Sequence, residues 1–304
     1  MKTEEHTFKS RDGIDIFYRV FLPDTKPRAI LQIFHGMAEH SARYADFAKY
    51  LNENGVAVYI SDHRGHGKSI SSPKDYGVWY NSDEWWRIVS DLKQLKDIAQ
   101  SQFPDVPYFV LGHSMGSFLA RTFITIHSPE LAGVIISGTG TNPTAVLRFG
   151  KFIATIACAF EGVTSKAKLL DKLSFGSYNK GYQSPYQWLS RDESQVKKYI
   201  EDDLCGGMFS NSFYRAFFSG LIYINKRSSG DLIDKNLKML FVSGDKDPVG
   251  NSGVGVLSAI DYYKRLNIKN INYKLYPDAR HEILNEINKE EVYSDILGWI
   301  ESAL

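Results

Sequence analysis

Residues 108–116 read Tyr-Phe-Val-Leu-Gly-His-Ser-Met-Gly, a short apolar run that leads into a turn with a glycine on each side of a serine. The residues after the turn, as far as Ile126, carry apolar side chains at helical spacing. So sharp a turn strains the backbone, and Gly112 and Gly116 remove side chains that would collide there. A purely structural turn can have the same glycines, but a strand before it and a helix after it are the setting of a nucleophile. We therefore predict that Ser114 is a catalytic nucleophile.

The pattern on either side of this turn recurs along the chain. Short apolar runs alternate with helical patterns, which is typical of a parallel sheet whose strands are buried on both faces. The predicted strands are Ala29 to Phe34, Val56 to Ile60, Tyr108 to Leu111, Val134 to Ile136, Leu237 to Val242 and Ile271 to Tyr276. Residues 4–22 differ, because the turn signal Arg11-Asp12-Gly13 lies between alternating runs and predicts an antiparallel hairpin. The predicted fold class is α/β, with a mostly parallel central sheet flanked by helices.

An insertion interrupts this alternation just before the last two predicted strands. Residues 140–231 have helical patterns and many aromatic side chains. In open α/β sheets, ligands bind at the carboxyl ends of the strands, where this insertion begins. We therefore predict a helical cap, or lid, over a core made of residues 1–139 and 232–304. A passive helical appendage would have the same pattern.

A serine hydroxyl needs an imidazole to take its proton and a carboxylate to orient that imidazole. His281 follows the last predicted strand and is the only histidine after His127, so we predict that His281 is the base. The loop after the preceding strand contains two candidate acids, Asp245 and Asp247. The spacing alone leaves the choice between them open.

A hole for the oxyanion is the third requirement of this chemistry, and backbone N–H groups are sufficient to form one. The N–H of Met115, the residue after the predicted nucleophile, is one expected donor. The other is the N–H of Met37, in the loop after the strand Ala29 to Phe34. We expect His35 to be a core histidine that supports this loop.

Composition limits the possible partners and the compartment. The chain has 36 Lys and Arg against 35 Asp and Glu, so no overall field would attract nucleic acid. The sequence starts without the apolar stretch of a signal peptide, and its longest apolar run is far too short to span a bilayer. Cys158 and Cys205 are too few for a disulfide framework and lack metal-ligand spacing. These features predict a cytoplasmic protein with reduced cysteines.

Two further stretches extend the pattern around Ser114. One is His35-Gly36-Met37-Ala38-Glu39-His40, followed by Arg43-Tyr44, and the other is Asp62-His63-Arg64-Gly65-His66-Gly67-Lys68-Ser69. With these stretches, the chain resembles the monoacylglycerol lipase and lysophospholipase-like branch of the α/β-hydrolases over nearly its full length. The resemblance implies an α/β-hydrolase fold and a serine hydrolase that cleaves small acyl esters through an acyl-enzyme.

The resemblance also assigns individual residues. It implies that Asp247 is the catalytic acid and that the amides of Met37 and Met115 are the oxyanion donors. The charged and aromatic residues Glu39, His40, Arg43 and Tyr44 are expected to brace the loop by pairing locally. The implied chemistry needs no cofactor, and no metal is expected because histidines 35, 40, 63, 66 and 113 lack ligand spacing.

Several interpretations of the substrate remain open. An acyl ester of a monoacylglycerol or a lysophospholipid is expected, with at most transient membrane or micelle contact through the cap. A small soluble ester is one alternative. An aminopeptidase would need an acidic residue in the cap to hold a free amine, and the candidates are Asp192, Glu193, Glu201, Asp202 and Asp203. A binding protein without activity is the third alternative.

Overall fold

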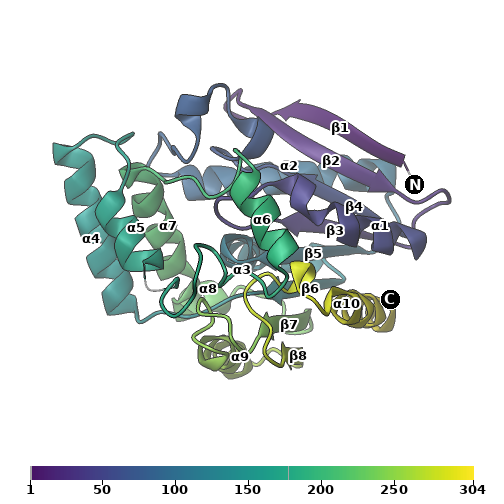
Figure 1. The fold of residues 1–304 in the computed structure, drawn as a ribbon. Coiled ribbons are helices and arrows are strands. Elements are labelled where there is room, and N and C mark those ends of the chain that lie inside the picture. Colours follow the sequence, from purple (N-terminus) through teal and green to yellow (C-terminus); the bar gives the residue numbers. More distant parts are fainter. Residues whose placement is uncertain (1, 177) are drawn as a thin grey trace.

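The computed structural model describes residues 2–176 and 178–304. Eight strands in these residues form one sheet, in the order β1-β2-β4-β3-β5-β6-β7-β8 (Figure 1). The strands are β1 (Lys2–Lys9), β2 (Asp15–Leu22), β3 (Ala29–Phe34), β4 (Val56–Ser61), β5 (Tyr108–His113), β6 (Gly133–Ser137), β7 (Lys238–Gly244) and β8 (Asn270–Tyr276). β1 and β2 form an antiparallel hairpin, β2 pairs antiparallel with β4, and all other neighbours are parallel. The predicted hairpin and the mostly parallel sheet are confirmed.

Helices cover both faces of the sheet, which explains its continuous apolar runs. Every residue of β3, β4 and β5 is buried. One face packs against α1 (Ala45–Glu53) and α10 (Lys289–Ala303). The other face packs against α2 (Glu84–Gln102), α3 (Met115–His127) and α9 (Val254–Arg265).

The chain between β6 and β7 forms further helices. These cap helices are α4 (Thr144–Phe160), α5 (Lys168–Phe175), α6 (Glu193–Glu201), α7 (Asn211–Ile224) and α8 (Arg227–Gly230). α4, α5 and α7 lie at the end of the molecule opposite the β1–β2 hairpin, whereas α6 lies nearer the sheet (Figure 1). The helical insertion before the last two strands is therefore confirmed, and its bounds at residues 140 and 231 stay a prediction.

Parallel strands direct the loops at their carboxyl ends to one edge of the sheet. The loops after β3, β5, β7 and β8 carry Met37, Ser114, Asp247 and His281, respectively. Four residues that are far apart in the sequence are thus brought to the same edge. Among the described residues, no helix is both long and apolar enough to cross a membrane.

Candidate active site

Ser114 lies between β5 and α3 in a conformation that few residues adopt. Its φ of 53° and ψ of −120° lie outside the regions favoured by L-residues. A side chain on Gly112 would collide with the backbone of Gly116, and one on Gly116 would collide with the carbonyl of Phe34. The strained backbone is held in place because the Ser114 N–H donates to the carbonyl of Ser137 at 3.0 Å. The turn therefore presents the serine at the N-terminus of α3.

His281 is paired with Asp247 in the interior. The Nδ1 of His281 lies 2.9 Å from Oδ2 of Asp247, and the two residues are 2% and 0% exposed. The other carboxylate oxygen accepts the N–H of Val249 at 2.8 Å, so it is fixed as well. Asp245 instead accepts the N–H of Asp278 at 2.8 Å. Of the two candidate acids, only Asp247 orients His281.

The surroundings of His281 favour its protonated form. Burial alone would lower the pKa of His281, but the charge and hydrogen bond of Asp247, together with nearby Glu282 and Glu39, raise it above its ordinary value. The imidazole packs between the rings of His113 and Trp188, at centroid distances of 4.7 and 5.1 Å. Because Nδ1 is engaged by Asp247, Nε2 is the nitrogen that remains to exchange a proton.

Ser114 and His281 line the same pocket, of about 270 Å³. No hydrogen bond joins their side chains within residues 2–176 and 178–304. Such hydrogen bonds are often long when no substrate is bound. Apolar side chains supply much of the wall, from both the core and the cap: Met37, Phe175, Pro185, Trp188, Leu189 and Met208.

One of the two predicted oxyanion donors, Met37, is among the residues that line this pocket, and the other, Met115, directly follows Ser114. Met115 is the first residue of α3, where helical N–H groups lack intrahelical partners. Neither amide donates a hydrogen bond to another described residue. Both N–H groups are therefore without a hydrogen-bond acceptor among the described residues, as an oxyanion donor requires.

Buried charges connect the loop of Met37 with the loop of His281. Arg43 forms ion pairs with both Glu39 and Glu282, and Tyr44 donates to Glu39 at 2.8 Å. Burial and the charge of Glu282 raise the pKa of Glu39. The expected local pairing is confirmed for Arg43 by its contact with Glu39, and Arg43 also pairs with Glu282 on a different loop, next to the predicted base His281.

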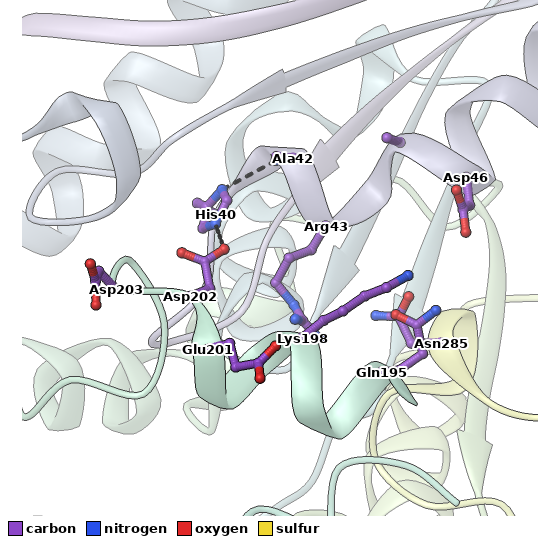
Figure 2. Close-up of a pocket in the computed structure, with 11 residues that line it drawn as sticks. His40, Ala42, Arg43, Asp46, Gln195, Lys198, Glu201, Asp202, Asp203 and Asn285 are labelled. Carbon is purple, nitrogen blue, oxygen red and sulfur yellow. Dashed lines mark hydrogen bonds and ion pairs between the residues drawn. The ribbon is translucent and has the colours of Figure 1, made fainter. Parts of the chain in front are cut away.

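A second, more polar cavity of about 620 Å³ lies beside α6 (Figure 2). It is lined by His40, Ala42, Arg43, Ala45, Asp46, Gln195, Lys198, Glu201, Asp202, Asp203 and Asn285. Figure 2 shows His40 between Ala42 and Asp202, with its Nε2 2.8 Å from Oδ2 of Asp202. His40 accepts the N–H of Ala42, as expected for local pairing, and it also pairs with Asp202 of the helical insertion.

The potential ligand atoms of His40, Asp202 and Cys205 lie within 4.8 Å of one another, a spacing that a metal ion could bridge. The hydrogen bonds argue against that role. The Nδ1 of His40 accepts the N–H of Ala42, so Nε2 carries the proton and donates to Asp202. Burial raises the pKa of Cys205, which disfavours the thiolate that binds metals. These contacts instead fasten the cap to the core.

The acidic residues proposed for an amine site are placed elsewhere. None of Asp192, Glu193, Glu201, Asp202 and Asp203 is among the described residues that line the pocket of Ser114. Asp171 of α5 lines it instead and accepts a hydrogen bond from Tyr214 at 3.2 Å. Sequence reasoning missed Asp171 because a lone acidic residue on an amphipathic helix resembles an ordinary surface residue.

Comparison with known proteins gives consistent matches over the whole chain. Residues 25–288 match the hydrolase family described as serine aminopeptidase, S33. The monoacylglycerol lipase of Mycolicibacterium smegmatis is 30% identical, over 99% of this chain and 98% of that protein. The monoglyceride lipase homologue of Monkeypox virus is 27% identical, over 95% of each chain.

Solved structures agree with the sequence matches. A thermostable carboxyl esterase from Bacillus coagulans, in complex with glycerol, superposes with a TM-score of 0.91 and 28% identity, over 100% of this chain and 99% of that one. A variant of monoglyceride lipase from Saccharomyces cerevisiae superposes with a TM-score of 0.76 at 19% identity, which supports the fold alone. The predicted α/β-hydrolase fold is confirmed.

Proposed function

Because this chain belongs to the serine aminopeptidase S33 family of hydrolases and is a serine ester hydrolase, we propose that Ser114, His281 and Asp247 are its catalytic triad. The amides of Met37 and Met115 complete the site as oxyanion donors. We further propose that residues 140–231 form the cap over a core of residues 1–139 and 232–304. The observation that carries the proposal is the buried Asp247–His281 hydrogen bond at the pocket that also contains Ser114.

In the first half of the proposed reaction, Ser114 Oγ attacks the ester carbonyl while His281 Nε2 takes its proton. The tetrahedral oxyanion accepts hydrogen bonds from Met37 and Met115. Protonated His281 then donates its proton to the leaving alcohol, and Asp247 stabilises the imidazolium that exists between these steps. In the second half, His281 takes a proton from the water that attacks the acyl-enzyme. It then donates that proton to Ser114 Oγ as the bond between Oγ and the acyl carbon breaks, and the free acid leaves.

We propose a monoacylglycerol or a similar uncharged acyl ester as the substrate. The apolar wall of the pocket suits an acyl chain. The charged side chains on the wall also bear on the head group: Glu39, Asp171 and Glu282 line the pocket, and no Lys or Arg is among the described lining residues. Arg43 pairs with Glu39 and Glu282, so a phosphate would face the carboxyl group of Asp171 without a cation on the described wall to bind it. An uncharged alcohol is therefore favoured over the phosphate of a lysophospholipid.

The proposal is tested first by labelling. A fluorophosphonate probe should attach to Ser114 in the active wild-type protein, as read by mass spectrometry of its peptides. The label should be absent from Ser114→Ala and from wild type that was first treated with a boronic acid. Full esterase activity in Ser114→Ala would refute the assignment of the nucleophile.

A substrate panel tests the head group separately. It contains a monoacylglycerol, the lysophosphatidylcholine of the same acyl chain, p-nitrophenyl esters of increasing length and amino-acid anilides. We expect the highest kcat/KM among natural lipids for the monoacylglycerol. Anilide turnover above ester turnover would favour the aminopeptidase alternative, and preference for the lysophospholipid would contradict the argument from charge.

We also propose transient contact with a lipid surface through α4. Phe149, Phe152 and Phe160 on this helix are exposed, and Arg148 and Lys151 are the nearby positive charges. An apolar face with basic neighbours favours binding at the interface of an anionic membrane. Binding of nucleic acid is not proposed. The two cysteines are free, which supports a cytoplasmic location as part of the proposal.

A further inference from the structure

We propose that His35 is a positioning residue that sets the orientation of the peptide group between Gly36 and Met37, and so directs the Met37 N–H into the active-site pocket. The inference rests on the proposed function, because it requires that this N–H binds the oxyanion. It gives His35 a specific task in the reaction without any contact with the substrate.

The geometry of one peptide group carries the argument. His35 is completely buried, and its Nδ1–H donates to the carbonyl of Gly36 at 2.7 Å. A trans peptide is planar, so the C=O of Gly36 and the N–H of Met37 point in opposite directions. Because His35 holds the carbonyl in the interior, the N–H must face away from His35. Met37 lines the pocket, and its N–H donates to no described residue.

A second histidine fixes which nitrogen of His35 carries the proton. The backbone N–H of His63 donates to Nε2 of His35 at 2.9 Å, so that nitrogen is an acceptor and Nδ1 must carry the hydrogen. In return, Nε2–H of His63 donates to the carbonyl of His35 at 3.1 Å. Burial keeps both rings neutral, since it lowers the pKa of His35 and brings that of His63 to about 3. The ring thus has one donor and one acceptor, each matched to one partner.

The peptide on the other side of Gly36 is held as well. The Gly36 N–H donates to Oε1 of Glu39 at 2.5 Å. A side chain at Gly36 would lie 2.6 Å from that same oxygen and 3.1 Å from Cβ of Ser114, which explains why the position is a glycine. Both peptide groups next to Gly36 are therefore oriented by buried side chains, and His35 controls the one that carries the proposed donor.

Two substitutions separate the two hydrogen bonds of the His35 ring. In His35→Asn, the amide nitrogen occupies roughly the place of Nδ1 and can still donate to Gly36. In His35→Gln, the longer side chain reaches the place of Nε2 and can still accept from His63, but the donor to Gly36 is lost. His66→Asn is the matched control, because His66 is buried in the same cluster and donates to the carbonyl of Arg64 rather than to this loop.

The readouts are kcat and KM for a soluble p-nitrophenyl ester and the inhibition constant of an alkyl trifluoromethyl ketone. Ser114 Oγ adds to the ketone carbon, the carbonyl electron pair becomes an oxyanion, and the serine proton moves to His281. We expect His35→Gln to lower kcat roughly 10- to 100-fold, which does not exceed the effect of removing a whole oxyanion donor. We expect KM to change less than about threefold. The ketone should bind more weakly by a similar factor. His35→Asn and His66→Asn should stay within about fivefold of wild type in all three constants.

Equal losses in His35→Asn and His35→Gln would overturn the role of His35. A lower kcat with unchanged ketone binding would overturn it as well. Neither result would contradict the proposed catalytic triad. A wild type that neither reacts with the ketone nor takes the fluorophosphonate label would overturn the proposed function, and the role of His35 with it. If His35→Gln does not fold, ¹⁵N NMR of the histidine rings of wild type still decides the matter. Protonation of His35 at Nε2 instead of Nδ1 would exclude the hydrogen bond to Gly36.

Discussion

The loops at the carboxyl edge of the sheet and the cap helices use their side chains in opposite ways. The loops bury polar groups and satisfy them with one another, as with Asp247, His281 and Glu39. The cap exposes apolar groups, and Phe152 and Phe160 of α4 are 60% and 87% accessible. Buried polar networks fix one geometry, whereas an exposed apolar face is free to meet another surface. The difference underlies two of our proposals, that the loops carry the chemistry and that α4 contacts lipid.

The comparison predicts that the largest effect comes from a loop residue. Asp247→Asn should lower kcat about 10⁴-fold, because the amide no longer holds His281 in the correct tautomer. The measurement is kcat for a soluble p-nitrophenyl ester. Asp245→Asn is the matched control two residues away and should stay within a few-fold of wild type. Comparable losses in both variants would contradict the assignment of the acid.

The buried charges of the loops should dominate stability. Arg43→Met leaves Glu39 and Glu282 buried without a cation, and we expect a loss of about 3–5 kcal/mol in the free energy of unfolding. Urea denaturation at neutral pH measures it. Arg87→Met, which removes two more exposed ion pairs, with Asp83 and Asp12, should cost less, about 1 kcal/mol or below. Similar values for the two variants would show that burial of the pair is irrelevant.

The pH dependence of catalysis should report the loop environment of His281. Only the neutral imidazole can accept the serine proton, so kcat/KM should rise with pH through the pKa of His281. Because that pKa is raised, the acid limb should lie above the ordinary histidine value of about 6.5, with roughly a tenfold loss per pH unit below it. Residual activity of Asp247→Asn should have its acid limb at lower pH. An unshifted limb in that variant would mean that another group controls it.

The cap should give the smallest effect on chemistry and a selective one. Phe152→Ser combined with Phe160→Ser should weaken binding to vesicles of phosphatidylcholine and phosphatidylglycerol and lower turnover of micellar monoacylglycerol several-fold, because apolar area is lost. Turnover of a soluble p-nitrophenyl ester should not change. Tyr80→Ser is the control, because it removes an exposed aromatic side chain that lies outside the cap. Equal vesicle binding by wild type and the double variant would argue against contact through α4.

The parts that the sequence predicted well are those with local signals. Apolar runs and turn residues predicted the sheet, and the strand–turn–helix pattern predicted the position of Ser114 between β5 and α3. The choice between Asp245 and Asp247 depended on the family resemblance, because two carboxylates in one loop differ only in where they point.

Contacts across the cap could not be predicted, because they depend on how separate segments meet. Asp171 reaches the pocket only once α5 lies over the sheet edge. The partner of Arg43 on the loop of His281, 239 residues away, has no sequence spacing that would reveal it. The catalytic roles of Ser114, Asp247 and His281 stay predictions until the labelling and kinetic experiments are done.

The main chain of the cap is itself hydrogen-bonded to the loop of His281, the proposed base. The N–H of His281 donates to the carbonyl of Trp188, and the N–H of Glu282 donates to that of Leu189, at 3.3 and 2.7 Å. The segments of the cap therefore differ in how freely they can be replaced during evolution. Recombination that replaces α4 and α5 can change specificity and leave His281 in place, whereas a new sequence around Trp188 must preserve the backbone turn that pairs with His281 and Glu282. A transplanted cap that includes this segment would have to bring its own matching histidine loop.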